Sequence, residues 1–359
     1  DDEINFICKY ATDRAEAMSK ERKGGILIQD MHNIVEGALE QVNPAVAKSY
    51  RDYRNYKVDF IHMMDEVYTK SQSIRYIGDK SNANTDSALV ATKRSLIFNE
   101  LNKELYRKFF MNRNELQACK DGYIYIHDQS ARLDTMNCCL FDVGSVLRGG
   151  FEMGNVWYNE PKTLDTAFDV MGDIILSTAA QQYGGFTVPE VDKILAPYAQ
   201  KSYNKYYEEF LKYSDPSWEG REEKGRVYAW EKVCRDCDQG WQGIEYKLNT
   251  VGSSRGDYPF VTVTLGLGTG RFEKMISKSL LKVHMGGQGK AGHKKPVLFP
   301  KIVFLYDEEI HGDGKECEDV FEAGVACSAK TMYPDWLSMS GQGYISSMYK
   351  KYKKVISPM

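Results

Sequence analysis

Two short groups of residues have side chains that could carry out chemistry. His127-Asp128 is a titratable pair, and Asn137-Cys138-Cys139 combines an amide with two adjacent thiols. A histidine beside a carboxylate suits proton transfer near neutral pH. The same residues also fit a purely structural interpretation, because free cysteine often packs as a small hydrophobic residue and a histidine after a strand is often buried in the core. From these residues alone both interpretations stay open.

Two predicted strands position these groups. Residues 123–126 (YIYI) are β-branched or aromatic and follow an Asp-Gly turn, so they predict a strand that ends at His127. Residues 135–143 predict a second strand that contains both cysteines. Successive side chains on a strand point to opposite faces. One thiol is therefore expected to face a cavity and the other to pack away from it.

Two further segments resemble ligand-binding loops. Ser253, Ser254 and Arg255 precede a glycine, and two hydroxyls, a guanidinium group and free backbone amides suit an anionic oxygen ligand. Residues 266–270 (GLGTG) follow a predicted strand, but their spacing differs from the dinucleotide fingerprint G-x-G-x-x-G. These glycines indicate a tight turn or a close backbone approach instead.

The composition is that of a globular protein with free thiols. The chain has 359 residues, 42% hydrophobic and 27% charged, with a net charge of -3, so neither a nucleic-acid nor a membrane partner is expected. No apolar run approaches the ~20 residues that span a bilayer. Eight cysteines without a secretory signal indicate a reducing, cytoplasmic environment. Cys234-x-x-Cys237 has no second pair nearby, so no zinc site is expected there.

Several motifs together resemble one enzyme family. His127-Asp128, a short loop and residues 137–142 (NCCLFD) are similar to the first barrel strand of anaerobic, class III ribonucleoside-triphosphate reductases, which are glycyl radical enzymes. In that family the cysteine after the asparagine lies in the active site, and Cys138 matches it. The family often has an acidic residue at the position of Ser130. Further matches are residues 181–206 (QQYGGFTVPEVDKILAPYAQKSYNKY), 253–260 (SSRGDYPF), 298–304 (LFPKIVF) and 332–338 (MYPDWLS).

The predicted fold is α/β. Five predicted strands, residues 135–143, 259–266, 299–306, 333–338 and 354–358, alternate with helices, which is typical of a parallel sheet. The resemblance sharpens this to the first half of a ten-stranded α/β barrel of the ribonucleotide reductase and glycyl radical type, preceded by helices.

Two domains are expected. Residues 1–58 resemble the last two helices of an ATP-cone, through Ile28 to Asp30, Val35-Glu36, Tyr50 and Tyr53-Arg54, without the strand and turn that contact the phosphates. Residues 59–359 would form the catalytic domain.

The resemblance implies reduction of ribonucleoside triphosphates to 2'-deoxyribonucleoside triphosphates by glycyl and thiyl radical chemistry, with formate as reductant. It implies catalytic roles for Cys138, Asn137 and His127, with Cys138 facing the barrel cavity and Cys139 packing outward. It also implies substrate binding by Ser253, Ser254 and Arg255, and effector binding by Lys205.

The resemblance further implies a homodimer, ATP, dATP and deoxynucleoside triphosphate effectors, and an S-adenosylmethionine-dependent iron–sulfur activase. The radical glycine, the thiyl cysteine and a four-cysteine zinc site are expected beyond Met359, so these residues alone are not expected to turn over substrate. Two alternatives remain at this point: a glycyl radical lyase of the pyruvate formate-lyase type, and a non-catalytic nucleotide-binding regulator.

Overall fold

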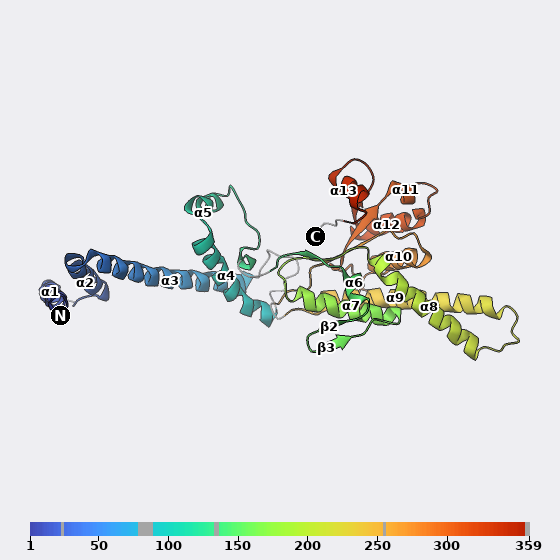
Figure 1. Ribbon diagram of the computed structural model, residues 1–359, viewed down its shortest axis with the longest axis horizontal. Coiled ribbons are helices and arrows are strands. Elements are labelled where there is room, and N and C mark those ends of the chain that lie inside the picture. Colours follow the sequence, from blue (N-terminus) through green and yellow to red (C-terminus); the bar gives the residue numbers. More distant parts are fainter. Residues whose placement is uncertain (23–24, 78–88, 133–135, 254–255, 356–359) are drawn as a thin grey trace. The chain divides into compact units, whose positions relative to one another are not determined.

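The computed structural model describes residues 1–22, 25–77, 89–132, 136–253 and 256–355, and divides the chain into two compact units, Asp1–Ser73 and Ile74–Met359. Figure 1 shows both units with their α-helices labelled. None of the helices in the described ranges is long and apolar enough to cross a membrane.

The first unit is helical. Helices α1 (Asp2–Glu21) and α2 (Ile28–Val42) pack on each other, and α3 (Pro44–Ile77) begins at a proline. Asn43 caps α3, because its side-chain oxygen accepts hydrogen bonds from Ala45 N (3.1 Å) and Val46 N (3.3 Å). Helices α2 and α3 are therefore separated at Asn43-Pro44.

A five-stranded parallel sheet forms the centre of the second unit. Its order is β1 (Cys139–Leu140), β4 (Phe186–Val188), β5 (Val261–Leu265), β6 (Lys301–Tyr306) and β7 (Asp335–Ser338). The predicted α/β alternation is confirmed, since a helix follows each strand. The short strands β2 (Phe151–Met153) and β3 (Val156–Tyr158) form a separate antiparallel hairpin.

Both faces of the sheet are covered. Along β6, Ile302 and Phe304 belong to the main hydrophobic cluster, whereas Val303 and Leu305 belong to a second cluster with Leu267 and Met339. This alternation follows from the two-residue period of a strand. The main cluster draws on the helices α6 (Val143–Leu147), α7 (Leu164–Ala179), α8 (Val191–Tyr213), α9 (Arg221–Thr250), α10 (Arg271–Gly286) and α12 (Glu318–Thr331).

The remaining elements are helical. Helices α4 (Val90–Phe110) and α5 (Arg113–Lys120) and the 3-10 turn η1 (Gln129–Ala131) precede the sheet, while α11 (Glu308–His311) and α13 (Tyr344–Tyr352) lie after β6 and β7. In Figure 1, α8 and α9 form a long helical hairpin, and they contact each other extensively.

Several strand predictions were wrong in detail. Of the strand predicted at residues 135–143, only Cys139–Leu140 forms a strand, so Cys138 precedes it and helix α6 begins at Val143. Residues 123–126 belong to no strand, because they pair with no neighbouring strand. Strand β4 was missed, since its three residues lie between Gly185 and Pro189 and too few of them exist to show a period. Residues 354–355 are outside any strand, and residues 356–358 of that prediction lie outside the described residues.

The glycine-rich segment after β5 wraps around a buried carboxylate. Asp192 Oδ2 accepts hydrogen bonds from Gly266 N (3.1 Å), Gly268 N (3.2 Å) and Ser277 Oγ (3.3 Å). A Cβ at Gly268 would lie 3.0 Å from this oxygen and closer still to Glu273. The predicted close backbone approach is thus confirmed, and this segment binds a side chain of the protein itself.

Candidate active site

The two motifs at residues 136–139 and 182–185 lie side by side. Tyr183 N donates to Met136 O (3.0 Å), Gly184 N to Asn137 O (2.5 Å), and Cys139 N to Gly185 O (3.0 Å). These bonds lead into the parallel pairing of β1 with β4, where Cys139 lies opposite Phe186. Sequence segments far apart in the chain therefore meet at the amino-terminal edge of the sheet.

The two adjacent thiols have different surroundings. Cys139 packs against the main hydrophobic cluster beneath the helices, and its Sγ donates to Gln182 Oε1 (3.0 Å). Burial raises the pKa of the Cys139 thiol, so it stays protonated at neutral pH. Cys138 Sγ instead accepts a hydrogen bond from Gly185 N (3.2 Å). Asn137 precedes it as an exposed residue.

Gly184 is required by this close approach. A Cβ built on Gly184 would lie 2.5 Å from both Cys138 Sγ and Asn137 Oδ1. Any larger residue would therefore push the thiol and the amide out of place. The first glycine of the pair Gly184-Gly185 therefore makes room for Cys138.

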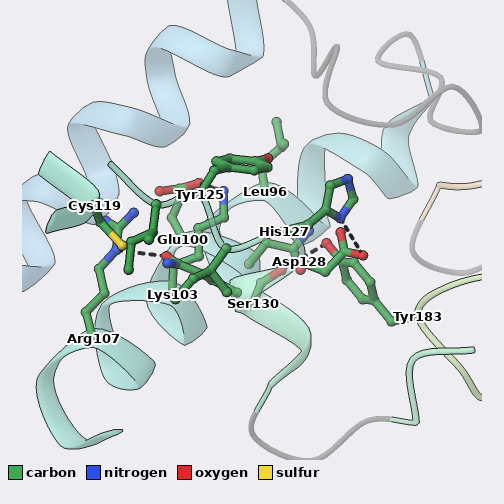
Figure 2. A pocket seen from close by; sticks show the side chains of 14 residues that line it. Leu96, Glu100, Lys103, Arg107, Cys119, Tyr125, His127, Asp128, Ser130 and Tyr183 are labelled. Carbon is green, nitrogen blue, oxygen red and sulfur yellow. Dashed lines mark hydrogen bonds and ion pairs between the residues drawn. The ribbon is translucent and has the colours of Figure 1, made fainter. Parts of the chain in front are cut away.

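His127 and Asp128 line a pocket of about 200 Å³. His127 Nδ1 lies 2.7 Å from Asp128 Oδ2, and Asp128 adopts a left-handed backbone conformation with φ of 55°. Figure 2 shows Glu100, Lys103 and Arg107 of α4 at one end of this pocket, and His127, Asp128 and Tyr183 at the other. The pocket is thus polar and holds charges of both signs.

Helix α4 supplies a charged wall that the motifs did not predict. Lys103 Nζ lies 2.7 Å from Glu100 Oε1, and Arg107 Nε donates to Gln129 Oε1 (3.0 Å). Arg107 also pairs with Glu104 at 2.8 Å. The three-residue spacing of these charges is visible in the sequence, but such pairs are common on solvated helix faces and carry no site information alone.

Tyr183 joins the two parts of the site. Its hydroxyl and Ser130 Oγ lie 2.9 Å apart, so the serine that replaces the family's acidic residue contacts the His127 pocket through a hydroxyl pair. Tyr183 also lines a second pocket of about 120 Å³, together with Gly184, Ser253 and Asp257. The predicted motifs around His127, Cys138 and Ser253 therefore meet around one tyrosine that the sequence did not single out.

The turn at Ser253 is closed by an aspartate. Ser253 Oγ donates to Asp257 Oδ1, and Ser253 N donates to Asp257 O (2.8 Å). Thr92 Oγ1 donates to Gly256 O (2.8 Å), which attaches the turn to α4. Ser254 and Arg255 lie outside the described residues, so the structure places only Ser253 of the predicted anion-binding group.

Comparison with known proteins decides the family. A family model for anaerobic ribonucleoside-triphosphate reductase matches residues 81–359. The reductase of that name from Escherichia coli (strain K12) is 31% identical over 332 residues, covering 89% of this chain and 45% of the relative. That of Enterobacteria phage T4 is 35% identical over 261 residues, covering 72% of this chain and 41% of the relative.

This chain belongs to the anaerobic ribonucleoside-triphosphate reductase family. It spans about half the length of the curated relatives it matches. Family membership favours the reductase over the lyase and the non-catalytic regulator that remained as alternatives.

The structure also resembles solved reductases. An anaerobic ribonucleotide reductase from Thermotoga maritima, crystallised with glycerol in the active site, matches with a TM-score of 0.56 at 14% identity, over 86% of this chain and 53% of that one. A similarity at this identity concerns the fold. The predicted fold, half of the reductase α/β barrel, is therefore confirmed, with five parallel strands in the described part of the chain.

Lys205, the predicted effector-binding residue, lines neither of the two pockets described above. Lys205 is exposed on α8, and its Nζ lies 5.9 Å from the ring centroid of Tyr206. Cys234 and Cys237 are free thiols on α9. Within the described ranges, no group of three or more His, Cys, Asp or Glu residues could hold a metal ion.

Proposed function

We propose that this chain is part of an anaerobic reductase that converts ribonucleoside triphosphates to 2'-deoxyribonucleoside triphosphates, and that Cys138 is a catalytic thiol. The observation that supports this role is the contact between residues 137–139 and 183–185. It brings Cys138 next to Gly184, which lines the Ser253 pocket, while the adjacent thiol packs against the main hydrophobic cluster. Family membership supplies the reaction class.

The proposed reaction replaces the C2'–OH bond of the ribose by a C2'–H bond. The hydroxyl leaves as water, and formate supplies the two electrons and becomes carbon dioxide. A glycyl radical, on residues other than those described, would supply the initiating radical through a thiyl cysteine. Cys138 would then give its thiol hydrogen to the substrate radical, which suits the weak S–H bond.

The neighbouring residues have distinct proposed roles. Asn137, exposed beside Cys138, would hydrogen-bond the ribose, and His127 with Asp128 would move the proton that the leaving hydroxyl needs. Ser253, Ser254 and Arg255 would hold the triphosphate. The pocket next to Gly184 supports this placement, because Ser253 lines it.

The proposal includes regulation and assembly. Lys205 would contact a deoxynucleoside triphosphate effector in a homodimer, and residues 1–58 would form a partial ATP-cone without the strand and turn that contact the phosphates. A zinc site and an S-adenosylmethionine-dependent activase would belong to the complete enzyme. The eight free cysteines agree with a reducing, cytoplasmic location.

Cysteine substitutions in the complete enzyme test the proposal. Cys138→Ala is expected to retain the glycyl radical on activation but to abolish deoxynucleotide production, because the substrate radical loses its hydrogen donor. Cys139→Ala should keep turnover and lower the free energy of unfolding by about 1–2 kcal/mol, since Gln182 loses its buried partner. Electron paramagnetic resonance and product formation are measured together. Normal deoxynucleotide yield from Cys138→Ala contradicts the proposal.

A further inference from the structure

Solvent exposure does not distinguish the two adjacent thiols, but their hydrogen bonds do. Cys138 and Cys139 are both partly exposed. The Cys139 thiol donates to Gln182 Oε1 (3.0 Å), so its hydrogen is engaged. Cys138 Sγ accepts from Gly185 N (3.2 Å), and in the described part of the chain no acceptor for its own hydrogen is found. The Cys138 hydrogen is therefore available for transfer.

Gln182 contacts both the Cys139 thiol and the backbone of Gly185. Its side chain is buried, with 2% of its surface exposed. While Oε1 accepts from Cys139, Nε2 donates to Gly185 O (3.1 Å), the same oxygen that accepts from Cys139 N (3.0 Å). The Gln182 side chain therefore fixes the Cys139 thiol and the carbonyl group of Gly185. The N–H of Gly185 points at Cys138.

The strand pairing is displaced at this point. In a regular parallel ladder that continues the pairing of Cys139 with Phe186, Gly185 N would donate to Asn137 O. Instead Gly184 N donates to Asn137 O (2.5 Å), which leaves Gly185 N free to donate to the Cys138 sulfur. Gln182 holds the carbonyl of this same residue, Gly185.

We propose that Gln182 is a positioning residue that determines which of the two adjacent thiols is available for chemistry. Its Oε1 accepts the hydrogen of the Cys139 thiol. It also orients Gly185, so that the Cys138 sulfur accepts a hydrogen bond while the Cys138 hydrogen stays free. The functional part of this proposal rests on the proposed role of Cys138. The difference in reactivity between the two thiols can be measured without turnover.

Alkylation of the native 359-residue chain by iodoacetamide, followed by tandem mass spectrometry, measures the two rates separately. Cys138 is expected to react faster than Cys139. Gln182→Met keeps the side-chain length without its hydrogen bonds. This variant should lower the ratio of the Cys138 rate to the Cys139 rate about tenfold, the factor that corresponds to one hydrogen bond.

Two variants serve as controls. Gln181→Met changes the exposed neighbour, whose amide contacts only Ser177 O (3.4 Å) among the described residues, and should leave the ratio unchanged. Gln182→Glu keeps an acceptor for the Cys139 thiol and should preserve its protection. Circular dichroism and thermal melting verify the fold of each variant.

The ratio of the Cys138 alkylation rate to the Cys139 alkylation rate decides whether Gln182 has the proposed role. If Gln182→Met leaves it unchanged, or accelerates both thiols by the same factor as general loosening would, the positioning role is wrong. Failure of the proposed function is a separate result, because it would appear as normal turnover of Cys138→Ala, whatever the alkylation ratio.

Discussion

His311 is a buried histidine whose protonation is coupled to folding. Its Nε2 lies 2.9 Å from Gly266 O, its Nδ1 accepts from Asp307 N (3.0 Å), and its ring packs beside Phe304 and Tyr306. Burial lowers the pKa of His311 below its usual 6.5. Between the lowered pKa and 6.5 the unfolded chain binds more protons than the native one. The contribution of His311 to stability is therefore complete above 6.5 and declines as the pH falls.

The lowered pKa of His311 gives a prediction about how stability changes with pH. Between pH 7.5 and 5.5 the wild-type chain should lose more free energy of unfolding than His311→Gln, by up to about 1.4 kcal/mol per pH unit. Urea denaturation at both pH values measures the difference. His293→Gln, at an exposed histidine, is the control and should behave as the wild type does. Equal pH dependence in wild type and His311→Gln would show that this ring does not titrate differently on folding.

At the scale of elements, α9 carries two glycines with opposite expected effects. A Cβ at Gly240 would lie 2.1 Å from the Phe168 ring of α7, which packs edge-to-face on Trp241. A Cβ at Gly243 would meet nothing within 4 Å. The first glycine therefore permits α7 and α9 to pack closely, whereas the second only lowers helix propensity.

The two alanine variants separate packing from propensity. Gly240→Ala should destabilise the chain by about 1–3 kcal/mol through overpacking. Gly243→Ala should stabilise it by up to about 1 kcal/mol, because alanine is the better helix former. Thermal melting of both variants checks the pair. A stabilised Gly240→Ala variant would mean that Phe168 can move aside and that the close approach is not required.

At the scale of the whole molecule, the unit Asp1–Ser73 holds three of its four arginines in ion pairs. Glu36 lies 2.5 Å from Arg51 and 3.2 Å from Arg54, and Asp30 lies 2.6 Å from Arg22. Binding a polyphosphate needs cations and backbone amides that are free to contact it. We therefore expect residues 1–58 not to bind ATP at micromolar concentrations as they stand.

Calorimetric titration of ATP into the 359-residue chain, with and without residues 1–58, tests this expectation. Glu36→Gln should strengthen binding of inorganic triphosphate, since it removes the ion pair of Arg54 and leaves Arg51 only its pair with Glu40. Lys48–Asp52 is an exposed pair at 2.6 Å, so Asp52→Asn is a matched control with little expected effect. Micromolar ATP affinity that disappears when residues 1–58 are removed would refute the prediction.

The sequence by itself determined the features that depend on neighbouring residues. Strands β5 and β6 were predicted from their β-branched and apolar runs. Both thiols and the His127 pair were also visible, because residue types are read directly. Residues 123–126 were predicted as a strand from the same local preferences, which were insufficient without a pairing partner.

Only the tertiary structure decided how the motifs meet. Strand β4 has three residues, and its partners β1 and β5 are distant in sequence, so its register is set by long-range pairing. The same pairing brings Gly184 against Cys138 and aims Gln182 at Cys139. A local pattern specifies which residues are apolar or reactive. Which atom of a distant segment donates a hydrogen bond to them depends on the register of the sheet, and that is fixed only when the chain is folded.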